Sequence, residues 1–588
     1  MILDPHHPEQ HAAQPWSGRR LLLVAVLIGL VAGTAAWAFR LLIALIHNLA
    51  FFGVLSVTAE AEVHTPTARW GPWVVLVPMI FGIGVIWLIR NFAPEAKGHG
   101  VPEVMDAIYY RRGRIRGQVS VVKALASALT IGSGGSLGRE GPIVQIGAAF
   151  SSGLAQWLKM PMNQRNLLIA CGASGGIAAT FNAPLGGILF SVELLLLSVS
   201  SRTLMPVIIA AVVAANMGRY LIGPDPAFHV PGVALTGGEE SLPLLLVYTV
   251  FAALVGVLAL AFIKSVYWSE DFFERLPLGP YQRHLLGMFG LGLLMFGFHE
   301  YAGHYYVQGV GYATIQDLVS GTLTSPWLIV LLLGGKLLAT LLTIGSGGSG
   351  GVFSPSLYLG ACAGGAAGYA LVAVAPGLGV DPLTLTLVGM AAMVAATTSA
   401  PMTAAIMTYE LTLDYVVVLP IMIGVAVAYG VRLYFSSGDI YTIKLLRRGR
   451  RLPEGRFADV NSQIGVDDIM DKGIELVRVD DIITGGDKTC CAVDADERVI
   501  GIINPMRYRE GIDFRAGDAM LTDFVVLRAG MSLRQAFQVI GRSDSALALV
   551  SADGSTRADQ VRGVLNPYNL TRVMANASLM QEHDSAAN

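Results

Sequence analysis

The stretch "IGSGGSLGREGP", residues 131–142, contains the carboxylate of this chain that is best placed for chemistry. Glu140 stands beside Arg139 among five glycines, while the flanking segments "VVKALASALT" and "IVQIGAAF" are mostly apolar. Glycine lets a backbone turn sharply and approach a bound species closely, and Pro142 suits the first turn of a helix. The pattern predicts a helix that begins at a glycine-rich turn and carries a carboxylate at its start.

Two other stretches repeat this design. "GGVFSP" places Pro355 just inside a predicted helix start, and "GHGVPE" does the same with Pro102. Helix N-termini attract anions through their unpaired N–H groups and the helix dipole. Several such ends, converging from different segments, would hold a small anion weakly enough for release. Ionised Glu140 would compete for the anion's place and leave it on protonation, unless it only forms a buried salt bridge with Arg139.

The elements that position these residues are predicted to be membrane helices. Of the 588 residues, 53% are hydrophobic and 14% are charged, whereas soluble proteins carry about 25% charged residues. Apolar runs at 21–39, 73–89 and 242–263 are long enough to cross about 30 Å of hydrocarbon. Arg19 and Arg20 precede the first run, and a basic stretch follows the last apolar segment. The sequence therefore predicts a polytopic membrane protein with both ends in the cytoplasm.

An internal repeat runs through this membrane part. "KALASALTIGSGGS" and "KLLATLLTIGSGGS" match at eleven of fourteen positions with an offset of 213 residues. Two weaker pairs keep nearly the same offset, "NAPLGGILFSVEL" with "SAPMTAAIMTYEL" and "GHGVPEV" with "GVGYATI". Interrupted apolar segments at matching places in two halves indicate a binding site near the membrane midplane. The repeat halves are predicted at roughly 20–220 and 240–445.

Composition divides the rest of the chain, because residues from about 457 onward are charged as in a soluble domain. No metal site is expected, since the cysteines and histidines lack metal-ligand spacing. The predicted parts are a cytosolic leader at 1–18, the transmembrane domain at 19–448, a basic linker at 449–456, a cytosolic region at 457–576 and a flexible tail at 577–588.

Other functions that glycine strings suggest find less support. "GSGGSLGRE" lacks the Gly-Lys-Ser/Thr ending of a phosphate loop, and no paired metal ligands favour a membrane-embedded enzyme. "GVGYAT" is similar to a potassium filter, but it lies in the internal repeat without a pore-loop context. A secondary transporter for larger organic anions or oxyanions stays open as an alternative.

The motifs "GHGVPE", "GREGPIVQIG", "FNAPLGGILFSVE", "GGVFSP" and "IYTI", in this order, resemble the CLC family of chloride channels and chloride/proton exchangers. The resemblance covers roughly residues 20–447. It implies an all-α polytopic membrane fold with two internal repeats of broken helices and about eighteen helical segments. It also implies a homodimer with a separate pore in each subunit.

The resemblance assigns the external gating glutamate to Glu140. Backbone amides at two helix starts would line the outer and central anion sites, and the Tyr441 hydroxyl in "GDIYTIK" would donate to the anion. The structural alternative for Tyr441 is an interfacial aromatic. The implied anion-binding residues are His99, Gly100, Arg139, Gly141, Val352, Phe353 and Tyr441.

His99 departs from the usual family pattern Gly-Ser-Gly-Ile-Pro, in which the serine faces the central anion. A neutral imidazole donates one hydrogen bond, and a protonated one adds charge. His99 is therefore predicted to tune anion selectivity and to sense pH, unless its ring is turned away and inert.

Leu194 is the second departure. It falls in "FSVELLL" where typical exchangers carry the internal proton-relay glutamate, and channel members also have an apolar residue there. Glu193 matches the preceding family position and is repeated at Glu410, which favours a structural role for both. Protons would then reach Glu140 through a water chain.

Residues 457–575 resemble a pair of CBS domains. The second copy reads strand, helix, strand, strand, helix, whereas the first copy, near 465–512, is shortened. Arg507 and Asn569 stand where nucleotide-binding copies have an aspartate for ribose. A packing or dimer-stabilising role is therefore favoured over nucleotide binding.

Together these features predict chloride transport through a CLC-type pore that is coupled to or gated by protons at Glu140. The alternatives are a passive voltage- or pH-gated chloride channel, favoured by Leu194, and an exchanger for nitrate or fluoride. No enzymatic activity, cofactor or nucleic-acid partner is expected. The expected partners are a second subunit, chloride, protons and the lipid bilayer of a bacterial inner or plasma membrane.

Overall fold

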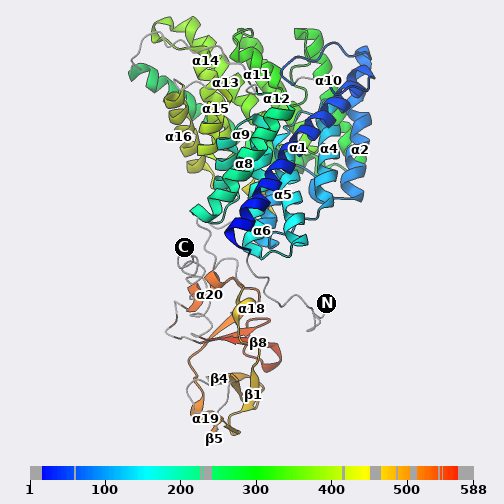
Figure 1. The fold of residues 1–588 in the computed structure, drawn as a ribbon. Helices are drawn as coiled ribbons and strands as arrows, with labels where there is room; N and C mark the ends of the chain where they lie inside the picture. The colour runs from blue at the N-terminus through cyan, green and yellow to red at the C-terminus, as the bar shows by residue number, and fades with distance from the viewer. Residues whose placement is uncertain are drawn as a thin grey trace. The chain divides into compact units, whose positions relative to one another are not determined.

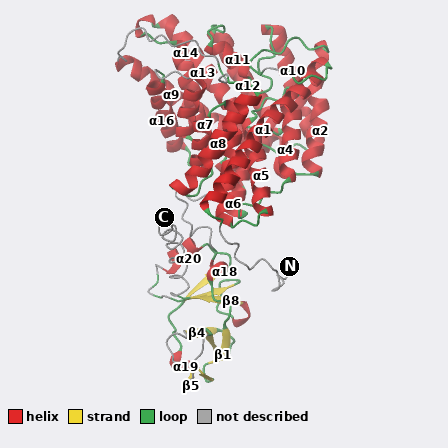
Figure 2. Cartoon of the chain, in the orientation of Figure 1, coloured by secondary structure: helices red, strands yellow, loops and turns green. Residues whose placement is uncertain are grey.

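The computed structural model divides the chain into a helical unit, Met1–Leu452, and a smaller unit of strands and helices, Pro453–Asn588 (Figures 1 and 2). The predicted tail at 577–588 and most of the leader at 1–18 lie outside the part of the chain that the structure describes. That part comprises residues 16–58, 61–224, 228, 242–412, 417–450, 465–484, 488–503, 513–540, 543, 545 and 547–566.

In its described residues the membrane unit has two halves of eight α-helices followed by one short helix, which confirms the predicted all-α fold. Eight described helical segments are long and apolar enough to cross a membrane. The first half contains α1 (Gly18–Phe52), α2 (Val77–Asn91), α3 (Val101–Tyr110), α4 (Gln118–Gly132), α5 (Glu140–Trp157), α6 (Met162–Phe181), α7 (Pro184–Leu194) and α8 (Ser201–Leu221). The second part contains α9 (Leu242–Arg275), α10 (Pro280–Ala302), α11 (Tyr312–Val319), α12 (Pro326–Gly345), α13 (Phe353–Val374), α14 (Pro382–Thr398), α15 (Pro401–Thr412), α16 (Val418–Phe435) and α17 (Thr442–Arg447).

Local signals set several helix ends. α1 stops at Gly53, which adopts the left-handed conformation with φ of 69°. α8 begins with a capping box between Ser200 and Thr203. α14 begins after Asp381, whose carboxylate accepts hydrogen bonds from the first-turn N–H groups. These caps satisfy backbone groups that a helix end would otherwise leave unpaired.

The two halves run in opposite directions through the membrane. The Tyr305 hydroxyl, just beyond the end of α10, accepts a hydrogen bond from the Ala68 N–H, and its ring lies 5.8 Å from that of Phe51 at the end of α1. α9 and α10 both cross the membrane and are joined by the short turn 276–279. α9 therefore begins at the face where α1 ends. The repeat is inverted, the arrangement that places binding sites between halves.

Equivalent small residues pack the helices of each half. A Cβ added at Gly147 on α5 would lie 2.2 Å from the carbonyl oxygen of Gly172 on α6. A Cβ added at Gly360 on α13 would lie 2.2 Å from the carbonyl oxygen of Gly389 on α14. Glycine at these positions lets membrane helices approach backbone to backbone. The repeat therefore preserves packing as well as sequence.

Both described ends of the membrane unit lie at one face. The Trp16 N–H donates to Gln164 in the first turn of α6, at 3.1 Å. Asn166 in the same turn donates to a carbonyl of α3, and Arg450 pairs with Asp106 on α3. The chain thus enters α1 and leaves α17 on the same side of the membrane.

The smaller unit contains two sheets of identical topology. β1 (Glu475–Arg478), β3 (Cys490–Val493) and β4 (Val499–Ile503) form one sheet, and β6 (Val525–Arg528), β7 (Ala548–Ser551) and β8 (Val561–Leu565) form the other. In each sheet the first pairing is parallel and the second antiparallel, with a register shift near the same end. The remaining elements are α18 (Val466–Ile469), β2 (Ile482–Thr484), β5 (Asp513–Arg515), α19 (Ala516–Ala519) and α20 (Leu533–Ile540).

This topology agrees with two related copies. α20 separates β6 from β7, whereas the described residues between β1 and β3 contain β2 and no helix, as expected for a shortened first copy. The predicted last helix, and the ribose positions Arg507 and Asn569, lie outside the described residues.

Candidate functional site

The two glycine-rich breaks meet at equivalent positions. The N–H of Gly138 donates to the carbonyl of Gly351 at 2.7 Å, and the N–H of Gly351 donates back to the carbonyl of Gly138 at 2.7 Å. These residues are 213 positions apart, the offset of the repeat. Such a reciprocal contact is what a two-fold relation between halves produces. The site therefore forms around the internal symmetry axis.

Three helix starts lie against one another at this point. α5 begins at Glu140 and α13 at Phe353, while α3 follows Gly100, whose φ is 91°. A Cβ added at Gly141 would lie 2.1 Å from the carbonyl oxygen of His99 and 2.9 Å from the Cα of Gly351. The first turns of a helix leave N–H groups without intrahelical partners. The structure thus brings the predicted anion-attracting ends together.

Glu140 is held by two hydroxyl groups from the second half. Its carboxylate is buried, with 2% of the residue exposed. Oε1 accepts hydrogen bonds from the Tyr312 hydroxyl at 2.5 Å and from the Ser354 hydroxyl at 2.7 Å, and these two hydroxyls are 3.1 Å apart. Oε2 has no hydrogen-bond partner among the described residues. The two hydroxyl groups of the second half therefore fix the position of this side chain at the start of α5.

Sequence reasoning missed Tyr312 and Ser354. Ser354 directly follows Phe353 in the motif "GGVFSP", and Tyr312 lies in the string "GVGYAT" that was compared with a potassium filter. Tyr312 is the first residue of α11 and is fully buried. Its equivalence to the first residue of α3, given by the repeat, was a signal that could have placed it at the site.

Arg139 does not form the alternative salt bridge with Glu140. Its guanidinium lies over the Tyr312 ring, 5.1 Å from the centroid. Within the described residues it has no ion pair, and its Nε is buried without a partner. Arg139 therefore adds positive charge near the Glu140 carboxylate without forming an ion pair with it.

His99 is buried beside two lysines. The residue has no exposed surface, and both ring nitrogens lack partners in the described part of the chain. Lys123 donates to the carbonyl of Gly98 at 2.7 Å, and the Lys444 ammonium lies next to the same glycine. A buried donor without a partner is costly. The His99 ring also lies edge-on to the Tyr267 ring, with centroids 6.4 Å apart.

Lys123 and Lys336 are equivalent buried lysines that sequence reasoning did not single out. Lys123 donates to the carbonyls of Ala96 and Gly98, and Lys336 donates to those of Val307 and Gly309. Both lysines have no exposed surface. Each therefore fixes the glycine-containing segment that leads into α3 or α11.

Tyr441 is buried, with 2% of the residue exposed, which excludes the interfacial alternative. It precedes α17, and its N–H donates to Asp439 at 2.7 Å. The Tyr267 hydroxyl donates to the carbonyl of Ile440 at 2.5 Å. These contacts fix the backbone on both sides of Tyr441 within the core.

Glu193 and Glu410 each cap the helix that carries the other. Glu193 on α7 accepts hydrogen bonds from the N–H groups of Met402 and Thr403 in the first turn of α15, at 3.0 and 2.8 Å. Glu410 on α15 accepts them from the N–H groups of residues 185 and 186 in the first turn of α7, at 3.0 and 2.7 Å. The adjacent Leu194 is buried. These contacts support the structural role expected for both glutamates.

A family model described as "Voltage gated chloride channel" matches residues 81–433 of this chain. The chain belongs to this family. A "Putative chloride channel protein ClcB-like" of Ralstonia nicotianae is 32% identical over 444 residues, with 73% of this chain and 97% of that protein covered. An "H(+)/Cl(-) exchange transporter ClcA" of Vibrio parahaemolyticus is 32% identical over 437 residues, with 73% and 89% covered.

Solved structures agree with this membership in the voltage gated chloride channel family. A slow cyanobacterial Cl−/H+ antiporter superposes with a TM-score of 0.63 at 25% identity, over 73% of this chain and 98% of that chain. A CLC-type fluoride/proton antiporter superposes with a TM-score of 0.58 at 21% identity, over 72% and 97%, and supports the fold alone. The predicted resemblance and the integral multi-pass membrane location are confirmed.

Proposed function

We propose that this protein transports chloride through a pore in each subunit of a homodimer, and that protonation of Glu140 controls anion passage. The observation that carries the proposal is the position of the Glu140 carboxylate. It lies at the meeting point of three helix starts and accepts hydrogen bonds from Tyr312 and Ser354. Groups that stabilise a carboxylate through N–H and O–H donors also stabilise a small anion.

Each transport step follows from competition between the Glu140 carboxylate and chloride for the same hydrogen-bond donors. Ionised Glu140 occupies the place that attracts anions, and the hydroxyls of Tyr312 and Ser354 hold it there. A proton on Glu140 removes the charge that strengthens both hydrogen bonds, so the side chain swings away. The same hydroxyl and N–H donors then serve an arriving chloride ion. Anion and proton occupancy are thereby linked through one residue.

Proton coupling is the favoured form of this mechanism, with His99 and Tyr441 as the ligands of a central anion. Relatives that are 32% identical to this chain include proteins named as H(+)/Cl(-) exchange transporters. A passive chloride channel is the second candidate, because Leu194 offers no ionisable group at the relay position. Nitrate and fluoride are the alternative anions.

The orientation proposed for the protein places both termini in the cytoplasm of a bacterial cell. The face that carries the start of α1 and the end of α17 also carries basic residues at 111, 112, 114 and 116. Positive charge is enriched in cytoplasmic segments. For the smaller unit we propose a packing or dimer-stabilising role without a bound nucleotide.

Chloride efflux from proteoliposomes, with external pH recorded, tests the function. We expect chloride loss together with proton movement against the proton gradient, and the loss of proton movement in Glu140→Gln. Chloride flux without proton movement would identify the passive channel. Absence of chloride flux from purified, folded dimer would contradict the proposal.

A further inference from the structure

A cluster of two histidines and one aspartate lies at the face where α1 ends. His64 Nε2 is 2.7 Å from Asp317 Oδ2, and the side chains are 16% and 30% exposed. The His64 ring stacks on that of His304 with centroids 4.4 Å apart and an interplanar angle of 15°. The Tyr306 ring packs edge-on against both histidines, at 5.0 and 5.5 Å. Three separate segments therefore meet at this cluster.

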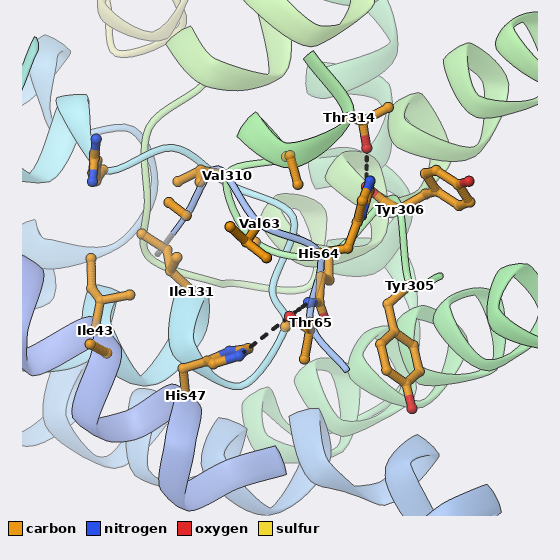
Figure 3. A pocket seen from close by; sticks show the side chains of 18 of the residues that line it. Ile43, His47, Val63, His64, Thr65, Ile131, Tyr305, Tyr306, Val310 and Thr314 are labelled. Carbon is orange, nitrogen blue, oxygen red and sulfur yellow. Dashed lines mark hydrogen bonds between the residues drawn. The ribbon is translucent and has the colours of Figure 1, made fainter. Parts of the chain in front are cut away.

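The cluster is fixed to the helix that holds the gate. Asp317 belongs to α11, whose first residue, Tyr312, donates to Glu140. α11 is a single eight-residue helix, so a pull on one end is transmitted to the other. Thr314 on the same helix donates to the carbonyl of Tyr306 at 3.3 Å, and Figure 3 shows this bond beside His64.

A cavity of about 100 Å³ lies beside the cluster and borders the start of α11. Its walls include His64, Thr314 and the Arg139 side chain, with His47 on the α1 side (Figure 3). Tightly packed interiors resist displacement, whereas a void leaves room for side chains and short helices to shift. Ala313 and Thr314 in the first turn of α11 border this void, which gives that side of the turn room to shift.

We propose that His64 and His304 form a proton-sensitive latch that positions α11, and with it the Tyr312 hydroxyl on Glu140. This inference rests on the proposed function. Under the proposed orientation the latch faces the outside of the cell. Asp317 and His64 are positioning residues, because they act on the gate through Tyr312 and do not touch the anion path directly.

The charges around the latch set the direction of the effect. The Asp317 carboxylate accepts a hydrogen bond from His64, and a positive charge on an imidazole adds Coulombic attraction to such a carboxylate. A second proton is opposed, because partial burial and the adjacent His64 lower the pKa of His304. Asp317 acts in the opposite direction, while His299 on α10 adds to the repulsion.

Arg40 and His47 line the same cavity as His64 from the α1 side. The charge of Arg40 favours a single positive charge on the histidine pair, which sits beside Asp317, while the His47 ring is hydrogen-bonded with Thr65. External acid therefore tightens the hold on α11 and steadies Tyr312 on Glu140. The latch acts as a brake that opposes the release of Glu140 by protons.

Chloride efflux from proteoliposomes at about pH 5 and about pH 8 outside tests the latch with Asp317→Asn. We expect the variant to be about fivefold faster than wild type at the acidic pH and much less affected at the alkaline pH, since the Coulombic attraction between the pair is lost only where the imidazole is charged. His64→Asn should show the same pattern. His47→Asn, which lines the cavity but does not contact Asp317, is the matched control and should not.

Two results would overturn the latch. One is a change in rate for Asp317→Asn that is equal at both pH values, and the other is a pH-selective effect that persists in the Tyr312→Phe background. The wild-type control separates failure of the latch from failure of the proposed function. If the wild-type protein shows no chloride efflux, the proposed function fails; if wild-type efflux is normal, a negative result concerns the latch alone. His64→Asn provides an independent reading if Asp317→Asn does not fold.

Discussion

The Tyr312 hydroxyl donates a hydrogen bond of 2.5 Å to Oε1 of Glu140, across the boundary between the two repeat halves. Glu140 begins α5 in the first half, and Tyr312 begins α11 in the second. The Glu140 carboxylate is thus held by a group that its own half does not supply. Movement of one half relative to the other would change how firmly the Glu140 side chain is held.

Tyr312→Phe should speed chloride transport. The substitution keeps the ring beneath Arg139 but removes one of the two donors to the Glu140 carboxylate. A hydrogen bond to a charged group contributes about 1.5 kcal/mol or more, which predicts an increase of about tenfold in turnover if release of Glu140 limits the rate. The initial rate of chloride efflux from proteoliposomes measures this turnover. Tyr369→Phe on α13 is the control, and equal effects of both variants would contradict the assignment.

Glu193→Ala should destabilise the membrane unit and spare proton movement. The carboxylate accepts two backbone hydrogen bonds at the start of α15, and loss of such a cap costs about 1–2 kcal/mol. Thermal unfolding of the dimer in detergent should show a lower midpoint for Glu193→Ala and a similar drop for Glu410→Ala. A normal midpoint combined with lost proton movement would instead make Glu193 a relay residue.

Gly147→Ala should destabilise the α5–α6 contact, whereas Gly153→Ala on the same helix should not. A Cβ at position 147 would meet a backbone carbonyl of α6 at 2.2 Å, while nothing lies within 4 Å of one at position 153. Alanine also favours a helix over glycine by about 1 kcal/mol, so Gly153→Ala should be neutral or stabilising. Thermal unfolding compares the pair, and equal midpoints would contradict the close approach of the helices.

His99→Ser should change the preference between chloride and nitrate. The imidazole is buried beside Lys123 with both nitrogens unpartnered in the described chain, so its replacement alters donors at the proposed anion site. We expect the chloride/nitrate flux ratio to shift by about threefold or more, because a changed hydrogen bond to an anion is worth about 1 kcal/mol. Flux ratios from the same vesicles measure it. An unchanged ratio would show that the His99 ring does not contact the anion.

The sequence predicted the helix starts of the site because their signals are local. Glycine strings followed by proline mark the beginnings of α3, α5 and α13, and each helix begins within the quoted motif. The internal repeat also indicated that Glu193 and Glu410 serve the same purpose. Their reciprocal capping follows from the two-fold relation between the halves. The sequence repeat implied such a relation but did not show that the halves are inverted.

The partners of Glu140 could not be predicted in this way. Tyr312 is 172 positions away, and its hydroxyl reaches the carboxylate only because the inverted halves bring α11 over α5. The Asp317–His64 pair spans 253 positions for the same reason. Periodicity and motif spacing describe neighbours along the chain, whereas these contacts depend on how two helices from different halves are placed.

The most direct test of the central claim is to locate bound anions by bromide anomalous diffraction in crystals of wild type and Glu140→Gln at neutral pH. The account predicts an additional bromide in Glu140→Gln at the place where the wild-type carboxylate meets Tyr312 and Ser354. It predicts no bromide there in wild type, because the ionised side chain occupies the position. Identical bromide sites in both proteins would show that Glu140 does not compete with the anion.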